Sequence, residues 1–381
     1  MFVNRVEYIL KHSAFAQKIY RVFFSFAFKV LGLFIRVNPK KVLISSLIGK
    51  NYGDSMKAIY DAMLDNPAFD GFEYVWAFDD PTKYDVPGAR KVKIVSPAYY
   101  IAALSSGIWL SNVSIERGLS FKPKKTIYLN TWHSMAINYV GNALNGRKDY
   151  DFSNIDFMCC GGEYEAEVFI RDFLVRPEVL VPCGLPRNDY LFKITDADKF
   201  AKRKELGLPL DKKIIFIAPT WRDSKDGGKT YPLNFPLDWK AWKDELSDKY
   251  IVLFRKHHIT TEVVGLEFDD FVIDMSDYPN INDLYVVSDI LISDYSSTLM
   301  DFSILERPLY SFAYDFDEYS SKRGFYKPLN ELFIDSVYTD QKDLLEHIVN
   351  LDYEEDCKKA RHIKEVYMNG DGTATKQCVD F

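Results

Sequence analysis

The stretch that most constrains the fold is residues 289–302, where a short apolar run changes into a small-polar triplet and then into a helical pattern. The apolar run has the length and composition of a buried strand, and Ser296-Ser297-Thr298 follows it. A second apolar strand is expected at residues 309–313, after the helix ends. We therefore expect the triplet at a helix N-terminus, beside the carboxyl end of a strand.

Such a place has two possible uses. Its free backbone N–H groups and the positive end of the helix dipole, together with three hydroxyls, would form a cradle for a phosphate or a diphosphate. An ordinary N-cap explains the same residues, because Ser and Thr are standard capping residues. Taken by itself, the segment leaves both interpretations open.

The same stretch resembles the signature of the CDP-glycerol glycerophosphotransferase family, the teichoic acid primases and polymerases of Gram-positive bacteria. The residues that carry the resemblance are Ser293-Asp294-Tyr295-Ser296-Ser297, Asp301-Phe302 and Arg307-Pro308. Further matches extend it from about residue 42 to the C-terminus. The resemblance implies a GT-B-like architecture, in which two Rossmann-like domains face a cleft.

The rest of the chain agrees with an α/β protein. It has 381 residues, enough for two domains, and apolar strands alternate with helical patterns throughout, which favours parallel sheets. The expected parts are an amphipathic arm (1–38), an acceptor-side domain (39–190), a CDP-polyol-binding domain (191–365) and a crossover segment (366–381). In the first domain the expected strands are Val42–Ser46, Tyr74–Phe78, Lys93–Val95, Ile108–Ser111 and Thr126–Leu129.

Composition and motifs exclude several classes of function. No Gly-x-Gly-x-x-Gly or Walker A motif occurs, which disfavours a dinucleotide oxidoreductase and a P-loop enzyme. The formal net charge of −7 makes nucleic acid an unexpected partner. The five cysteines lack the spacing of zinc ligands, and we interpret them as reduced thiols of a cytosolic protein. No metal ion and no cofactor is expected.

Charge is concentrated in the N-terminal arm. Residues 1–41 contain eight Lys or Arg and one acidic residue, so they carry +7 and the remainder carries −14. At about 100° per residue, the basic residues of the arm fall on one narrow face of a helix. These residues are Lys11, Lys18, Arg21, Lys29 and Arg36. They also interrupt the apolar run, which is too short for a membrane span.

Two interpretations of the arm remain. A helix lying in a membrane interface would place its basic groups at anionic lipid heads, and we favour this one. A helix packed on the protein body, with its basic stripe in water, is the alternative. The first predicts a peripheral protein on the cytoplasmic face of the cell membrane.

In the acceptor-side domain, two polar segments follow strands. Asp54 ends the block 49–54, which resembles the Gly-Lys-x-Tyr-x-Asp block of the family and would help to seat the acceptor; a plain turn is the alternative. His133 follows a strand directly, where open α/β sheets place their ligands, and a histidine can take a proton near neutral pH. The family motif here is Thr-Trp-His-Gly, and its His is the expected general base. The sequence departs from the family at Ser134, Ala136 and Asn138, which removes an expected lysine.

The second half contains three more matching blocks. Asn188 belongs to a Gly-x-Pro-Arg-Asn-Asp block that bridges the domains in the family, although a turn fixed by proline also explains it. Arg222 ends a Pro-Thr-Trp-Arg block and offers a forked cation to phosphate oxygens. Arg255 and His257 match an Arg-x-His block whose His contacts the donor diphosphate. His257 and His258, interpreted as neighbours on a strand, would point to opposite faces and so would not share a metal ion.

The resemblance implies a reaction as well. His133 would accept the proton of the acceptor hydroxyl, and His257, the second expected catalytic residue, would stabilise the departing CMP together with Arg222. The remaining expected substrate-binding residues are Arg255, Asp294, Ser296, Ser297, Asn188 and Asp54. The donor would be CDP-glycerol or CDP-ribitol, and the acceptor a hydroxyl on a polyprenyl-diphosphate lipid.

Two rival functions are a GT-B glycosyltransferase that uses a nucleotide sugar and a membrane-bound binding protein with a degenerate site. The sequence leaves open the choice of glycerol or ribitol, the number of units added and the oligomeric state.

Overall fold

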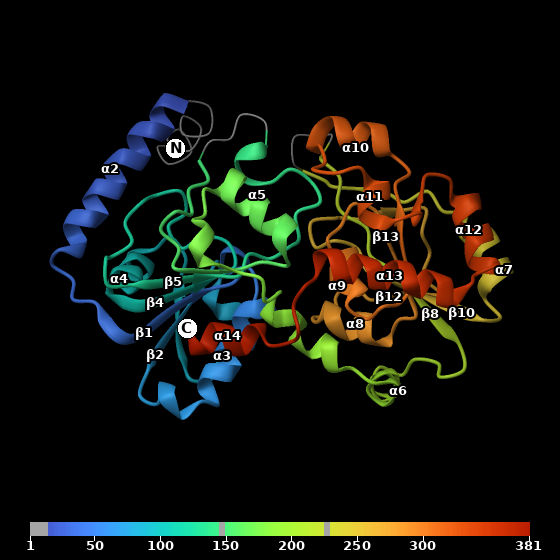
Figure 1. Cartoon of the computed structure of the whole chain (residues 1–381), viewed down its shortest axis with the longest axis horizontal. Coiled ribbons are helices and arrows are strands. Elements are labelled where there is room, and N and C mark those ends of the chain that lie inside the picture. The colour runs from blue at the N-terminus through green and yellow to red at the C-terminus, as the bar shows by residue number, and fades with distance from the viewer. Residues whose placement is uncertain (1–13, 145–148, 225–228) are drawn as a thin grey trace.

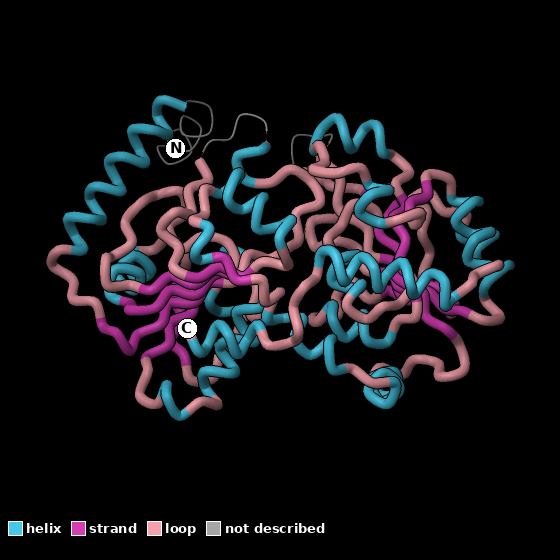
Figure 2. Tube along the Cα trace, in the orientation of Figure 1, coloured by secondary structure: helices cyan, strands magenta, loops and turns pink. Residues whose placement is uncertain are grey.

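The computed structural model of the protein describes residues 14–144, 149–224 and 229–381. Two sheets lie beside each other, each in the middle of its own group of helices (Figures 1 and 2). All strand pairs in both sheets are parallel. The expected α/β class with two parallel sheets is therefore confirmed.

The first sheet has seven strands in the order β3-β2-β1-β4-β5-β6-β7. The strands are β1 Asn38–Ser45, β2 Glu73–Phe78, β3 Ala89–Lys93, β4 Ser106–Ser111, β5 Ile127–Asn130, β6 Phe157–Cys159 and β7 Leu180–Val181. The helices that cover it are α3 Asp54–Leu64, α4 Pro97–Ser105 and α5 Glu163–Phe173.

The second sheet has six strands in the order β12-β10-β8-β13-β14-β15. The strands are β8 Lys213–Ile217, β10 Tyr250–Phe254, β12 Val272–Asp274, β13 Ile290–Ser293, β14 Leu309–Phe312 and β15 Val337–Tyr338. Its helices are α6 Asp196–Glu205, α7 Trp239–Leu246, α8 Ile281–Val287, α9 Thr298–Ser303, α10 Phe316–Arg323, α11 Leu329–Phe333, α12 Gln341–Val349 and α13 Tyr353–Tyr367. A small separate sheet pairs β9 Leu233–Asn234 with β11 Val263–Val264.

Each large sheet is buried on both faces, and this explains the continuous apolar runs of its strands. In β1, Val42 and Ile44 join one hydrophobic cluster, whereas Leu43 joins the cluster on the opposite face. In β8, Ile214 and Ile215 divide in the same way between the two clusters of the second domain. Successive side chains of a strand alternate between faces, so a strand covered on both sides needs apolar residues at every position.

The chain crosses between the domains twice. After α13 it returns to the first domain, where α14 (Ala374–Asp380) packs beside α3 and contributes Ala374 and Cys378 to the core (Figure 1). The Sγ atoms of Cys378 and Cys159 lie 3.5 Å apart, so α14 also touches β6. Two chain segments therefore connect the domains.

The arm contains one long helix, α2 (Ala14–Gly32), at the outer side of the first domain (Figure 1). Part of it packs on the protein, because Phe28 stacks on Tyr100 with ring centroids 4.2 Å apart and also meets Phe121. Lys11 of the predicted basic stripe lies outside the described residues. No helix within the described ranges is both long and apolar enough to span a bilayer.

Two expected strands differ from those observed. The strand expected at 93–95 was wrong, since β3 occupies 89–93 and pairs with β2 at the edge of the sheet. Most of its residues are exposed or half-exposed, so no apolar run marks it. β1 begins at Asn38, four residues before the expected start, because its polar first residues extend beyond the buried run.

Candidate active site

His133 is held in one tautomer at the carboxyl end of the first sheet. β5 ends at Asn130, and Trp132 adopts a left-handed conformation with φ of 52°, an uncommon backbone state for a bulky residue. The His133 Nδ1–H donates to the carbonyl oxygen of Asn112 over 2.8 Å. Because a carbonyl only accepts, Nδ1 carries the proton and Nε2 keeps a free lone pair. Burial lowers the pKa of His133, which keeps it neutral and able to take a proton.

Asp54 supports the residue that orients His133. Its Oδ1 accepts a hydrogen bond from the Asn112 side chain over 3.0 Å, and its Oδ2 pairs with Arg187 over 3.0 Å. Burial raises the pKa of Asp54, but Arg187 and the hydrogen bonds from Ser55 and Asn112 outweigh it, so the pKa is lowered. The carboxylate is therefore ionised and acts on His133 through Asn112. Its expected contact with the acceptor stays a prediction.

Arg187 connects this support to the second domain. One of its nitrogens donates to the His133 carbonyl oxygen over 2.8 Å, and another donates to the Asp301 carboxylate of α9 over 2.8 Å. Asn188 is fully buried and donates to the other Asp301 oxygen over 2.7 Å. The structure thus places Asn188 among the hydrogen bonds that join the two domains. Its expected contact with a substrate stays a prediction.

His257 has the opposite hydrogen-bonding state. It lies after β10, and its Nδ1 accepts the backbone N–H of Ile259 over 3.3 Å. The proton of the neutral ring is therefore on Nε2, which can donate to an anionic group. Burial and the neighbouring His258 lower the pKa of His257 to about 4, so the ring is neutral at pH 7.

The sequence suggested that the tandem histidines lie on a strand, but in the structure they lie after one. β10 ends at Phe254, and the rings of His257 and His258 lie close together, with centroids 4.3 Å apart. The reason given against a shared metal ion was therefore wrong. Within the described residues no group of three or more His, Cys, Asp and Glu side chains could hold a metal ion.

The hydroxyl triplet lies where it was expected, at the start of α9, with Ser296 and Ser297 before the helix and Thr298 as its first residue. Ser296, Ser297 and Thr298 are half-buried, and Ser296 Oγ accepts the backbone N–H of Thr298 over 3.2 Å. The Ser297 hydroxyl makes no capping hydrogen bond to the helix, and Thr298 Oγ1 is buried without a partner in the described chain. The helix has only six residues, so the hydroxyls and not its dipole are the main attraction for an anion.

Arg222 does not offer a free guanidinium. It donates to Asp294 over 2.8 Å and to Asp315 over 2.7 Å, with Thr220 as a further partner. Asp294 is fully buried and also accepts from Thr220. Arg222 and Asp294 therefore hold the ends of β8 and β13 together. They lie beside a cavity of about 410 Å³ that Arg222 lines. Their expected contacts with the diphosphate stay predictions.

The structure also shows what Arg255 and Asn138 contact. Arg255 donates to the carbonyl oxygen of Tyr278, and burial lowers its pKa. Asn138, where the family has lysine, donates to the Tyr295 carbonyl oxygen over 3.4 Å and to the Tyr319 hydroxyl over 3.2 Å. This departure thus supplies hydrogen bonds between the domains in place of a cation.

Asn112 and Arg187 both contact His133, and the sequence reasoning did not name them as site residues. Arg187 stands inside the quoted Gly-x-Pro-Arg-Asn-Asp block, so that motif could have singled it out. Asn112 follows β4 directly and is fully buried. Its position at the carboxyl end of a predicted strand was the only available signal.

Comparisons with known proteins agree with this arrangement. The chain is 34% identical over 335 residues to a teichoic acid poly(glycerol phosphate) polymerase of Staphylococcus epidermidis, covering 83% of this chain but 46% of that protein. It is 29% identical over 378 residues to a teichoic acid glycerol-phosphate transferase of Staphylococcus aureus, covering 92% and 91% of the two chains.

A solved structure extends the likeness to three dimensions. A variant of the wall teichoic acid polymerase TagF, soaked with CDPG, superposes with a TM-score of 0.78 at 32% identity, covering 90% of this chain and 88% of that one. The expected GT-B architecture is therefore confirmed. A family described as CDP-glycerol:poly(glycerophosphate) glycerophosphotransferase matches residues 26–381, and the chain belongs to this family.

Proposed function

We propose that the protein transfers glycerol phosphate from CDP-glycerol to a hydroxyl of a polyprenyl-diphosphate-linked acceptor in teichoic acid synthesis, and releases CMP. The observation that carries this proposal is the pair of neutral histidines, one on each domain, in opposite tautomers. His133 has a free Nε2 lone pair, and His257 has an Nε2–H to donate. A base on one side and a hydrogen-bond donor on the other suit a displacement at phosphorus.

The steps balance as a phosphoryl transfer. The acceptor oxygen attacks the phosphorus that bears glycerol, while His133 Nε2 takes the hydroxyl proton. The bond from this phosphorus to the bridging oxygen breaks, and CMP leaves with that oxygen and its electron pair. His257 Nε2–H and the hydroxyls of Ser296 and Ser297 stabilise the charge that develops on the phosphates.

The proposed activity is tested by product analysis. The full chain is incubated with a lipid-linked acceptor and with CDP-glycerol, CDP-ribitol or a UDP-sugar, and the products are identified by mass spectrometry. An acceptor extended by glycerol phosphate, with one CMP released for each unit, is the expected result. Extension by ribitol phosphate alone would assign the other polyol, and extension by a sugar would identify a glycosyltransferase.

We also infer that α2 holds the enzyme on the cytoplasmic face of the membrane. Phe24 and Phe28 face the protein, whereas another stripe of the helix is apolar and exposed. This stripe consists of Phe15, Ile19, Val22, Phe23, Phe26 and Val30. The exposed lysines Lys18 and Lys29 lie beside it. An apolar stripe next to basic residues suits an interface with anionic lipid.

Vesicle co-sedimentation tests this attachment through changes on the exposed stripe. The double variant Phe23→Gln/Phe26→Gln should bind anionic vesicles at least about tenfold more weakly, since burying one Phe contributes about 1.5–3 kcal/mol. Phe200→Gln/Phe268→Gln, which changes two exposed phenylalanines elsewhere, is the matched control. Equal binding by both variants, or indifference to lipid charge, would make α2 a packed structural helix only.

A further inference from the structure

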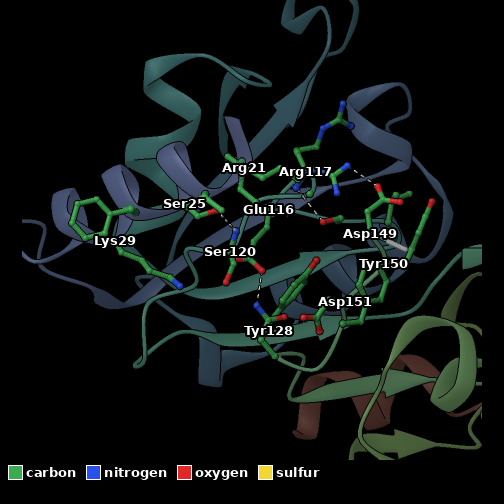
Figure 3. A pocket seen from close by; sticks show the side chains of 18 of the residues that line it. Arg21, Ser25, Lys29, Glu116, Arg117, Ser120, Tyr128, Asp149, Tyr150 and Asp151 are labelled. Atoms are coloured by element: carbon green, nitrogen blue, oxygen red, sulfur yellow. Dashed lines mark hydrogen bonds and ion pairs between the residues drawn. The ribbon is translucent and has the colours of Figure 1, made fainter. Parts of the chain in front are cut away.

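A cavity of about 700 Å³ lies between α2 and the first domain (Figure 3). Residues 21–29 of α2 form one wall, residues 113–120 after β4 form another, and residues 149–154 close the third side. The cavity thus adjoins the loop that follows β4 at its carboxyl end. In open α/β sheets this is the edge where ligands bind.

The mouth of the cavity is apolar and belongs to the proposed membrane face. Val22 and Phe26 line it, and they are 63% and 67% exposed. Both are members of the exposed stripe of α2. An acyl or prenyl chain that leaves the bilayer at this helix would therefore meet apolar side chains at the mouth of the cavity.

The rim carries cations that are available to an anion. Lys29 and Arg117 are both exposed, and within the described ranges no ion pair engages either head group. Arg21, the third cation, pairs with Asp149 over 3.0 Å. In Figure 3 Arg21 and Arg117 lie close together on one side of the cavity, with Lys29 on another.

Three carboxylates also line the cavity, and each has partners of its own. Glu116 is buried and accepts the backbone N–H groups of Phe121 and Lys122. Asp149 is engaged by Arg21, and Asp151 accepts from both the backbone and the hydroxyl of Ser153. The carboxylates are therefore committed to the fold, whereas two of the three cations are not.

The inner end of the cavity lies beside residues that contact or neighbour His133. Val113 lines it and directly follows Asn112, whose carbonyl oxygen holds His133 Nδ1. Tyr150 and Phe152 also line it, and their rings pack against Trp132 with centroids 6.4 and 6.1 Å away. A ligand in the cavity would thus lie against the residues that position the base.

We propose that this cavity binds the anionic head of the lipid-linked acceptor, with its diphosphate on Lys29 and Arg117 and its lipid chain along Val22 and Phe26. The inference rests on the proposed function, since it assigns that enzyme a place for its acceptor. It is favoured over a bulk phospholipid because the cavity combines an apolar mouth, a cationic rim and an inner end beside the residues that position the general base. The three zones match the three parts of a lipid-linked acceptor in order.

The test measures steady-state kinetics with a soluble, short-chain diphosphate-linked acceptor, so that vesicle binding plays no part. Lys29→Gln/Arg117→Gln should raise the KM for this acceptor by about tenfold or more, because the loss of even one charge-assisted hydrogen bond costs about that factor. The KM for CDP-glycerol should stay within twofold of the parent. The matched control is Lys124→Gln/Lys125→Gln, which removes two exposed charges before the amino end of β5.

A second measurement locates the lipid chain. A photoreactive benzophenone residue at position 26 should cross-link to a radiolabelled lipid-linked acceptor, and an excess of phosphatidylglycerol should not compete. The same residue at position 34, which is also exposed on the arm but does not line the cavity, should cross-link much less.

The outcomes separate this inference from the proposed function. A parent enzyme that extends the acceptor, together with equal acceptor KM values in the two double variants, would overturn the cavity assignment alone. Cross-linking that phosphatidylglycerol abolishes would assign the cavity to bulk lipid. A parent enzyme that extends no acceptor from CDP-glycerol would refute the proposed function itself.

Discussion

His133 and His257 lie at the carboxyl ends of two similar parallel sheets, yet the chain holds them in opposite states. The first donates through Nδ1 to a carbonyl oxygen, and the second accepts at Nδ1 from a backbone N–H. In each ring a single main-chain contact therefore fixes the tautomer. It leaves Nε2 of His133 with a lone pair and Nε2 of His257 with a proton. The same residue type can thus serve as a base on one domain and as an anion's hydrogen-bond donor on the other.

The surroundings of the two histidines differ as well. His133 is supported by a buried ionic network that reaches from Asp54 through Arg187 to Asp301 in the other domain. His257 is supported by a short loop and lies beside a second histidine. The first arrangement holds His133 in place with respect to the second domain, whereas burial and the neighbouring His258 lower the pKa of His257 and keep its ring neutral.

Replacing the base should have the largest effect. His133→Ala is expected to reduce turnover by about 10²- to 10⁴-fold, the range that a general base contributes, and to leave CDP-glycerol affinity nearly unchanged. Rates and calorimetric titrations of the variant measure the two quantities. His362→Ala, at an exposed histidine of α13, is the control. Turnover within threefold of the parent would remove His133 from the reaction and with it the contrast between the two rings.

Changes on the second domain should act on binding. His257→Ala and the double variant Ser296→Ala/Ser297→Ala should each weaken CDP-glycerol binding by roughly 10- to 150-fold, because each loses roughly 1.5–3 kcal/mol of hydrogen bonding to a charged group. Calorimetric titration gives the affinities. Ser105→Ala, at a half-buried hydroxyl at the end of α4 in the first domain, is the control. Unchanged affinity in both variants would refute a diphosphate site at His257 and the triplet.

The smallest effect concerns pH. His133 acts as a base only while it is neutral, and burial lowers its pKa below the ordinary 6.5. Half of the His133 rings are protonated when the pH equals their pKa. Because that pKa is below 6.5, kcat/KM should fall by less than about twofold between pH 8 and 6.5 and decline further at lower pH. His257, with a pKa of about 4, stays neutral over the same interval. A midpoint at or above pH 6.5 would indicate that water reaches the His133 ring.

His133 could be predicted from the sequence because it directly follows an apolar strand, and His257 because its Arg-x-His block resembles that of the family. The network around them could not. Asn112 lies 58 positions from Asp54, and Arg187 lies 114 positions from Asp301. Their contacts depend on how distant segments pack, and no local pattern records that distance.

Arg222 shows the same limit in another form. The sequence correctly placed a forked cation after β8, and its chemistry suited phosphate. The structure instead pairs it with Asp315, which lies 93 positions away and belongs to no recognised block. A motif thus indicates where a side chain lies. The hydrogen-bond partners of that side chain determine which of its donors remain for a ligand.

The position of α14 also affects how the protein is made. This helix completes the core of the first domain with Ala374 and Cys378, although the whole second domain lies between it and β7 in the sequence. At ordinary rates of synthesis, about 5–20 residues per second, the first domain waits roughly 10 to 40 seconds on the ribosome with part of its core uncovered. Domains that finish before their neighbours begin can fold in turn, but here the first domain is closed only after the second has been made. We therefore expect nascent chains to depend on chaperones most strongly before α14 emerges.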